Sequence, residues 1–310
     1  MSAQVETMFY TRQKPWHGLG TMVQEAPTSR EALILAGLNW KVVQKPIVTY
    51  DGIAIPGFKA NVRDTDNHVL GVVTDRYQVV QNEEAFSFTD SLLGQGVTYE
   101  TAGSLQHGRR TWMLAKLPHH YIINGDEITP YLVFMNSHDG TGAIKAAMTP
   151  IRVVCSNTLN LALSTAKRSW STNHVGDIQG KMEDARYTLL YADKYMAELG
   201  KTIDQLNRQK LSDRQVLEYI DALFPLTVDA TDIQKKNVLR MKEDMMARFY
   251  DAPDLQHIDK NAYRFINAVS DFATHAKPLR ERANYKENLF ARTVDGNPMI
   301  DKAYSLVQAA

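Results

Sequence analysis

The chain has 310 residues, of which 44% are hydrophobic and 23% charged, and 35 basic residues balance 35 acidic ones. This composition is ordinary for a globular protein large enough for one or two domains. The single cysteine, Cys155, excludes an intrachain disulfide and a multi-cysteine zinc site. No apolar run reaches about 18 residues and the first residues lack a signal-peptide core, so we expect a cytoplasmic protein without a membrane segment.

Charge is balanced in each half of the sequence as well as overall. Residues 1–165 contain 13 basic and 14 acidic side chains, and residues 166–310 contain 22 and 21. Proteins that hold nucleic acid through its phosphates usually carry a basic surplus. Any nucleic-acid contact would therefore need a local groove, such as one that a ring-shaped oligomer builds from repeated basic residues.

The first half of the sequence alternates short apolar runs with turn residues, which predicts strands. A helix is expected after a cap at Thr28 or Ser29 and should end at Gly37. Asn82 is expected to cap a second helix over 83–93. Strands are expected over 40–50, 57–64 and 68–80, in a hairpin over 98–118 with its tip at Gln106–Gly108, and over 121–136 around an Asn-Gly turn.

The sequence changes character near residue 165. A strand that carries Arg152 is expected to lead, through an Asn157-Thr158 cap, into a helix over 158–165. Beyond it, helical periodicity predicts one helix over 181–208, one that starts at Ser212 and stops before Pro225, and two more over 232–250 and 261–276. We therefore predict an α+β fold, with an N-terminal antiparallel-sheet domain with short helices over 1–165 and a helical C-terminal region over 166–310.

A polar turn between two apolar runs is the most informative local feature. The stretch PYLVFMNSHDGTGAIKAAMTPIRVV gives five ligand-loop candidates, namely Asn136, Ser137, His138, Asp139 and Thr141. Adjacent strand residues point in opposite directions, so these cannot form a catalytic triad among themselves, and no Gly-x-Ser-x-Gly elbow is present. Turn architecture or ligand contact is the favoured interpretation, and a hydrolase that uses His138 and Asp139 is the alternative.

Metal and phosphate motifs are weak in this sequence. Of the nine histidines, His119 and His120 are adjacent and the others lack a helical partner or a carboxylate at ligand spacing. The segments WHGLG and HDGTG could present backbone N–H groups to an anion, but no Walker lysine or Gly-x-Gly-x-x-Gly accompanies them. We predict no metal and no cofactor, and leave open a composite site assembled by the fold.

Basic residues stand beside aromatic ones at several positions. Guanidinium groups and ring faces are what single-strand channels use, the former for phosphates and the latter for bases. Arg152 is flanked by apolar residues, so it is expected at a solvent face or against a carboxylate or ligand. The predicted nucleic-acid-binding residues are Arg109, Arg110, Trp112, Lys145, Arg152, Lys167 and Arg168.

The segment NSHDGTGAIKAAMTPIRVVCSNTLNLAL resembles the phage/plasmid-like protein family, a domain family of unknown function carried by phages, plasmids and laterally transferred islands. PWHGLG, RYQVVQNEEAFSF, AGSLQHGRRTWMLAKLP and GDEITPYLVFMNSHDG extend the resemblance. It implies a role in replication, recombination or countering host defence. The order of sheet, helix and arginine-bearing strand also resembles phage single-strand annealing proteins, which form rings or filaments on DNA without an enzyme active site.

Two functional hypotheses follow from these observations. The first is a non-enzymatic single-stranded-DNA-binding and annealing protein that works as a homo-oligomer, with Arg109, Arg110, Lys145 and Arg152 in one groove and Trp112 as a stacking surface. The second is an interaction protein that sequesters a host factor or a small nucleotide ligand at the HDGTG loop. Salt-dependent oligonucleotide binding separates them, because only the first relies on phosphate contacts.

Overall fold

A computed structural model describes residues 5–11, 20–93, 98–117, 121–123, 126–152, 157–158, 169–189, 192–278 and 297–309. The fold class is α+β, as predicted, with strands up to Thr172 and mainly helices beyond it. The contacts divide the chain into two compact units, Met1–His119 with Pro130–Met148 and Arg168–Ala192, and His120–Thr129 with Thr149–Lys167 and Asp193–Ala310. The domain boundary at residue 165 stays a prediction, and these units cross it.

A large mixed sheet has the strand order β11-β10-β9-β7-β6-β1-β2, with β12 beside β10 and β8 beside β9. The pair β1 and β2 is parallel, whereas β1–β6, β6–β7, β7–β9, β8–β9, β10–β11 and β10–β12 are antiparallel. Its strands are β1 (Val5–Thr11), β2 (Thr21–Val23), β6 (Thr98–Leu105), β7 (Arg110–Lys116), β8 (Tyr121–Ile123), β9 (Asp126–Ser137), β10 (Ile144–Arg152), β11 (Asn157–Thr158) and β12 (Ser169–Thr172).

The β6–β7 hairpin is confirmed, and the expected cap after β10 is wrong. Gln106, His107 and Gly108 turn the hairpin with positive φ angles of 54°, 57° and 84°. Asn157 and Thr158 pair with Arg152 and Ile151 as a short strand, because their backbone groups complete the sheet ladder instead of opening a helix. The remainder of the helix predicted over 158–165 lies outside the described residues.

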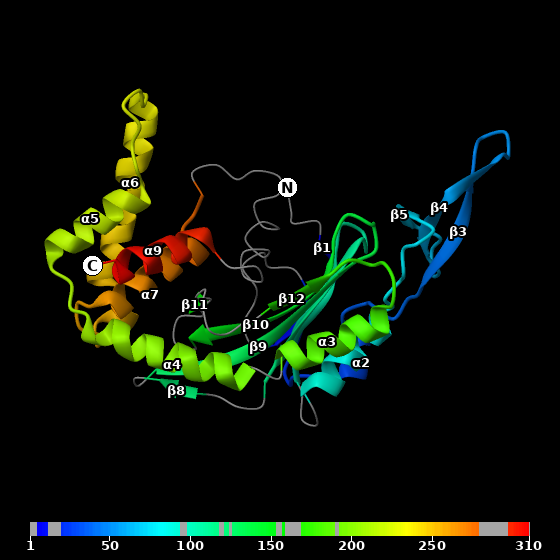
Figure 1. The fold of residues 1–310 in the computed structure, drawn as a ribbon, viewed down its shortest axis with the longest axis horizontal. Helices are drawn as coiled ribbons and strands as arrows, with labels where there is room; N and C mark the ends of the chain where they lie inside the picture. Colours follow the sequence, from blue (N-terminus) through cyan, green and yellow to red (C-terminus); the bar gives the residue numbers. More distant parts are fainter. Residues whose placement is uncertain are drawn as a thin grey trace. The chain divides into compact units, whose positions relative to one another are not determined.

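A second, three-stranded sheet is formed by β3 (Val42–Val48), β4 (Ala54–Arg63) and β5 (Val69–Thr74) in that order. Its ladder is antiparallel, and β3 and β4 continue into a hairpin that extends beyond β5 (Figure 1). Gly71 touches the turn that follows β9, since a Cβ there would lie 2.6 Å from Asp139 Cα. The small sheet is therefore packed against that turn at a position that only glycine allows.

Three helices, α1 (Ser29–Leu35), α2 (Asn82–Leu93) and α3 (Ile178–Leu189), cover one face of the large sheet (Figure 1). The first begins and ends as predicted. The backbone N–H and hydroxyl of Thr28 donate to the Glu31 carboxylate, and Gly37 ends the helix with a φ of 64°. The shared core contains Phe9, Ala32, Phe86, Met113, Phe134, Ile144, Ala146 and Met182.

The predicted cap at Asn82 is wrong. Gln81 caps α2 instead, since its backbone N–H donates to the Glu84 carboxylate at 2.8 Å. The Asn82 side chain is buried and joins two other segments, donating to the Leu38 carbonyl at 3.0 Å and meeting His138 Nε2 at 3.1 Å. Long-range hydrogen bonds therefore take the side chain that a local rule assigns to the helix end.

The helices of the second unit are α4 (Ala192–Arg208), α5 (Asp213–Leu223), α6 (Asp232–Asp251), α7 (Ala262–His275) and α9 (Pro298–Gln308), with a short 3₁₀ turn, η1, at Pro253–Leu255. Ser212 and Thr231 cap α5 and α6 through their hydroxyls. The stretch predicted as one helix over 181–208 is helical over 181–189 in α3 and over 192–208 in α4, and its continuity through 190–191 lies outside the described residues. Among the described helices, none has the length and apolar character needed to cross a bilayer.

Candidate functional site

The turn after β9 is held together by its own side chains. Asp139 Oδ1 accepts hydrogen bonds from the Ser137 hydroxyl at 2.6 Å and from the backbone and hydroxyl of Thr141 at 2.8 and 2.7 Å. Burial alone would raise the pKa of Asp139, but these bonds hold it below its ordinary value. The side chain of Asn136 is also hydrogen-bonded within the protein, since its amide nitrogen donates to the Val80 carbonyl at 2.8 Å. The predicted ligand loop is thus a self-bonded turn.

His138 lies at the centre of this turn and is fully buried. Its ring packs edge-on against Trp40 at 5.4 Å, and its backbone carbonyl accepts from Asn61 Nδ2 at 2.8 Å. Burial lowers the pKa of His138 to about 3, so the ring is neutral at neutral pH. Among the described residues, no group hydrogen-bonds to its Nδ1.

A catalytic relay is not assembled by these side chains. Ser137 Oγ donates to Asp139, while His138 Nε2 meets Asn82, so neither the nucleophile–base pair nor the base–carboxylate pair of a triad is formed. The burial of His138 also keeps its ring from solvent. The geometry therefore gives the hydrolase interpretation no support.

Tyr77 and His174 close the other side of the turn. The Tyr77 hydroxyl donates to the Ser137 carbonyl, and its ring stacks on His174 with centroids 4.5 Å apart. Burial raises the pKa of Tyr77 and lowers that of His174. The sequence interpretation missed both residues and also Trp40 and Asn61. Of these four residues, only Tyr77 had a signal in the sequence, because it lies within RYQVVQNEEAFSF, one of the segments that carry the family resemblance.

Arg109 and Arg110 lie beside this turn, at the start of β7. Arg109 is exposed, and no described carboxylate forms an ion pair with it. Its backbone carbonyl accepts from the His138 N–H at 2.7 Å, which ties it to the turn. Arg110 Nη2 lies 3.5 Å from Thr141 Oγ1, and its charge helps to lower the pKa of Asp139.

Strand register places three cations on one face of the large sheet. Met113 and Phe134 face the helices, so the alternate β7 residues Arg110 and Lys116 face the other way. Lys145 alternates with Ile144 and Ala146, which belong to the helix-covered core, and is therefore on the same face as Arg110. Tyr131 is directly opposite Lys116 and shares this face. We call Arg110, Lys116, Lys145 and Tyr131 the basic sheet face.

The remaining predicted residues do not all reach this face. Trp112 points the same way but is only 6% exposed, so the prediction that it offers a stacking surface is wrong. Arg152 ends β10 and belongs to the second unit. Lys167 and Arg168 lie outside the described residues. The first unit thus brings together Arg109, Arg110 and Lys145 of the seven, and a continuous groove through Arg152 stays a prediction.

The described residues define an α+β protein whose large sheet has helices on one face and, on the other, half-buried cations beside the buried Trp112 and Val133. Among those residues, no group of three or more histidine, cysteine or acidic side chains could hold a metal. The family model of a domain of unknown function, DUF932, matches residues 69–303. The chain belongs to this family, which confirms the resemblance to a family of unknown function. No curated protein and no solved structure matches the chain.

Proposed function

We propose that the chain binds single-stranded DNA on the basic sheet face and anneals complementary strands as a homo-oligomer, without an enzymatic step. The observation that carries this proposal is the common orientation of Arg110, Lys116 and Lys145, with exposed Arg109 at the end of the same strand. Cations on one face of a sheet suit a phosphate backbone, which repeats its charge at every nucleotide.

Base stacking in this mechanism falls to Tyr131 instead of Trp112. Tyr131 is half-buried and stands opposite Lys116, so one nucleotide could place its base on the ring and its phosphate at the ammonium group. The few cations of one copy give weak binding, and an oligomer multiplies them along the strand. A chain with no net charge also adds no repulsion of its own between two coated strands.

The test is a titration of a fluorescent oligonucleotide at several salt concentrations. The double variant Arg109→Ala/Lys116→Ala should bind more weakly. The slope of its log binding constant against log salt concentration should be shallower by about 1.4, since each phosphate contact on a single strand contributes about 0.7. Arg214→Ala on α5 is the matched control, because this arginine has an 88% exposed side chain outside the basic sheet face. Wild-type protein without affinity, or a slope that the double variant leaves unchanged, would refute the proposal.

Annealing is measured separately with two complementary labelled strands. The wild-type chain should accelerate their pairing, and Arg109→Ala/Lys116→Ala should lose the acceleration in proportion to its lost affinity. Binding without acceleration would restrict the function to coating of single strands. The rival function, sequestration of a host factor or small nucleotide at the HDGTG loop, stays a prediction, and its contacts would fall to exposed Gly140 and Thr141, because His138 is buried and Asp139 is bonded within the turn.

A further inference from the structure

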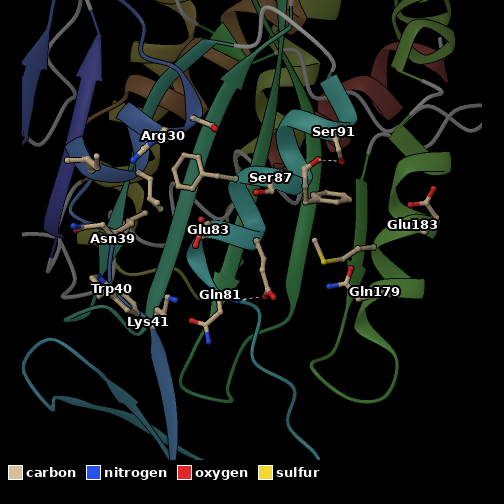
Figure 2. A pocket seen from close by; sticks show the side chains of 18 residues that line it. Arg30, Asn39, Trp40, Lys41, Gln81, Glu83, Ser87, Ser91, Gln179 and Glu183 are labelled. Carbon is tan, nitrogen blue, oxygen red and sulfur yellow. Dashed lines mark hydrogen bonds between the residues drawn. The ribbon is translucent and has the colours of Figure 1, made fainter.

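An open groove of about 1220 Å³ lies between α1, α2 and α3 on the outer side of the helix layer (Figure 2). Its floor is the outward side of α2, where Glu83, Ser87 and Ser91 recur every four residues. Residues at this spacing share one side of a helix. The two short serine side chains leave room for a helix to approach α2 closely.

The walls of the groove differ in chemistry. On the α1 side Leu33 and Ile34 are apolar, and Ile34 is exposed. On the α3 side Glu183 and Gln179 line the groove, and Figure 2 shows Glu83 between these two walls. Arg30 and Lys41 lie toward α1 and its following segment, so the acidic side of the groove belongs to α2 and α3. An amphipathic helix with one cationic side would complement it.

The first half of α6, in the second unit, has the matching chemistry. Ile233 is 75% exposed and Leu239 is 57% exposed, whereas Met245 and Phe249 in the second half are fully buried. Figure 1 shows the first turns of α6 extending beyond α5, α7 and α9. Such exposed apolar side chains on a regular helix indicate a contact surface. We call residues 231–241 the α6 arm.

Cations accompany the exposed apolar side chains of the α6 arm. Ile233, Lys236 and Arg240 recur at i, i+3 and i+7 and so share one side of the helix. Neither Lys236 nor Arg240 forms an ion pair within the described part of the chain. The span from Ile233 to Arg240 is about 10 Å and that from Glu83 to Ser91 about 12 Å, at 1.5 Å per residue.

We propose that the α6 arm of one copy docks in the α1–α2–α3 groove of a second copy. Lys236 and Arg240 then face Glu83 and Glu183, and the exposed apolar side chains of the arm, which lie on either side of these cations, pack against the rest of the groove. The contact joins different surfaces of two identical chains, so its repetition builds a ring or a filament. The inference rests on the proposed function only for the homo-oligomer, and names the surfaces that form it.

Charge reversal on each surface tests the contact in the absence of DNA. By size-exclusion chromatography with light scattering, the wild-type chain should exceed the 35.0 kDa mass of one copy. Lys236→Glu/Arg240→Glu and Glu83→Lys/Glu183→Lys should each reduce the mass to a single copy. An equimolar mixture of the two double variants should assemble again with the variants alternating, because a reversed arm then meets a reversed groove and an unreversed arm meets an unreversed groove.

The control is Lys201→Glu/Arg214→Glu, which reverses two exposed cations on α4 and α5 and should leave the mass unchanged. The inference is overturned by a monomeric wild-type chain, by unchanged mass in the reversed variants, or by a mixture that stays monomeric. It is also overturned if Tyr50→Ser/Ile53→Ser, on the exposed β3–β4 hairpin, is the variant that dissociates the oligomer. Should a reversed variant not fold, Lys236→Gln/Arg240→Gln gives the same test.

The two proposals fail in different ways. Loss of assembly in the charge-reversed variants is measured without DNA and so does not depend on the basic sheet face. Conversely, an Arg109→Ala/Lys116→Ala chain that assembles normally and keeps full oligonucleotide affinity refutes DNA binding at that face and leaves the arm–groove contact standing.

Discussion

The turn after β9 and the α6 arm reverse the usual placement of polar and apolar side chains. In the turn, His138 and Asn136 are buried and Asp139 is half-buried, each joined to the surrounding elements by hydrogen bonds. In the arm, Ile233 and Leu239 are in water. Buried polar groups need partners and so fix architecture, whereas exposed apolar groups gain stability only when another surface covers them.

The comparison separates two meanings of a strong local sequence signal. The HDG segment carries much of the family resemblance, yet its backbone lies against the three-stranded sheet at Asn61 and Gly71, and the Asp139 side chain holds the turn in shape. For the α6 arm, the sequence predicted only an amphipathic helix. A polar motif therefore indicates structure when its groups satisfy each other, and contact is to be sought where groups remain unsatisfied.

The largest expected effect on stability follows from adding a side chain at Gly71. A valine Cβ at this position would lie 2.6 Å from Asp139 Cα and 2.8 Å from its carbonyl oxygen, both backbone atoms. We expect Gly71→Val to lower the free energy of unfolding by about 3 kcal/mol, as over-packing against backbone does. Chemical denaturation measures this loss. Gly52→Ala is the control, because nothing lies within 4 Å of that Cβ and only its positive φ resists the change.

A smaller effect is expected from pH. The pKa of His138 falls from 6.5 to about 3 on burial, and that of His174 also falls. The unfolded chain therefore binds more protons than the folded one between these values, and stability decreases as pH falls through this window. His138 alone should remove about 2 kcal/mol between about pH 8 and pH 5.

The measurement for the pH effect is the free energy of unfolding as a function of pH. His138→Gln keeps an amide opposite Asn82 without a titrating ring, so its stability should vary less with pH than that of the wild-type chain. An unchanged pH dependence in this variant would mean that the ring is not held neutral by burial.

The hydroxyl of Tyr77 should contribute less still. It donates to the Ser137 carbonyl from a buried position, so Tyr77→Phe leaves that carbonyl without one of its hydrogen bonds. The expected loss is about 1 kcal/mol. Tyr50→Phe is the matched control, since Tyr50 is fully exposed at the tip of the β3–β4 hairpin and should show no loss. Equal losses in the two variants would contradict the structural role of the turn.

Sequence predicted the parts of this fold that depend on local hydrogen bonds. The Thr28 and Ser212 caps and the tip of the β6–β7 hairpin involve residues three or four positions apart. Asn82 and Trp112 were misjudged because their environments come from segments distant in sequence. No spacing rule states which side of a strand a later segment will cover.

Larger features escaped prediction for the same reason. The groove joins α1, α2 and α3, which begin at residues 29, 82 and 178, so no local pattern could assemble it. Of the site, sequence identified the turn and three of its cations, and the common face of Arg110 and Lys145 required the register.

The smallest expected effect on stability comes from substitutions in the α6 arm, in contrast to those at the turn. Ile233→Ser/Leu239→Ser removes two side chains that touch little of their own unit, so unfolding measured on dilute, unassembled protein should change by less than about 0.5 kcal/mol. The same variant should lose the oligomer, because the apolar part of the contact is gone. A double substitution that destabilises the dilute chain as strongly as Gly71→Val would show that the arm is covered within its own molecule, and the reversal between the two regions would then disappear.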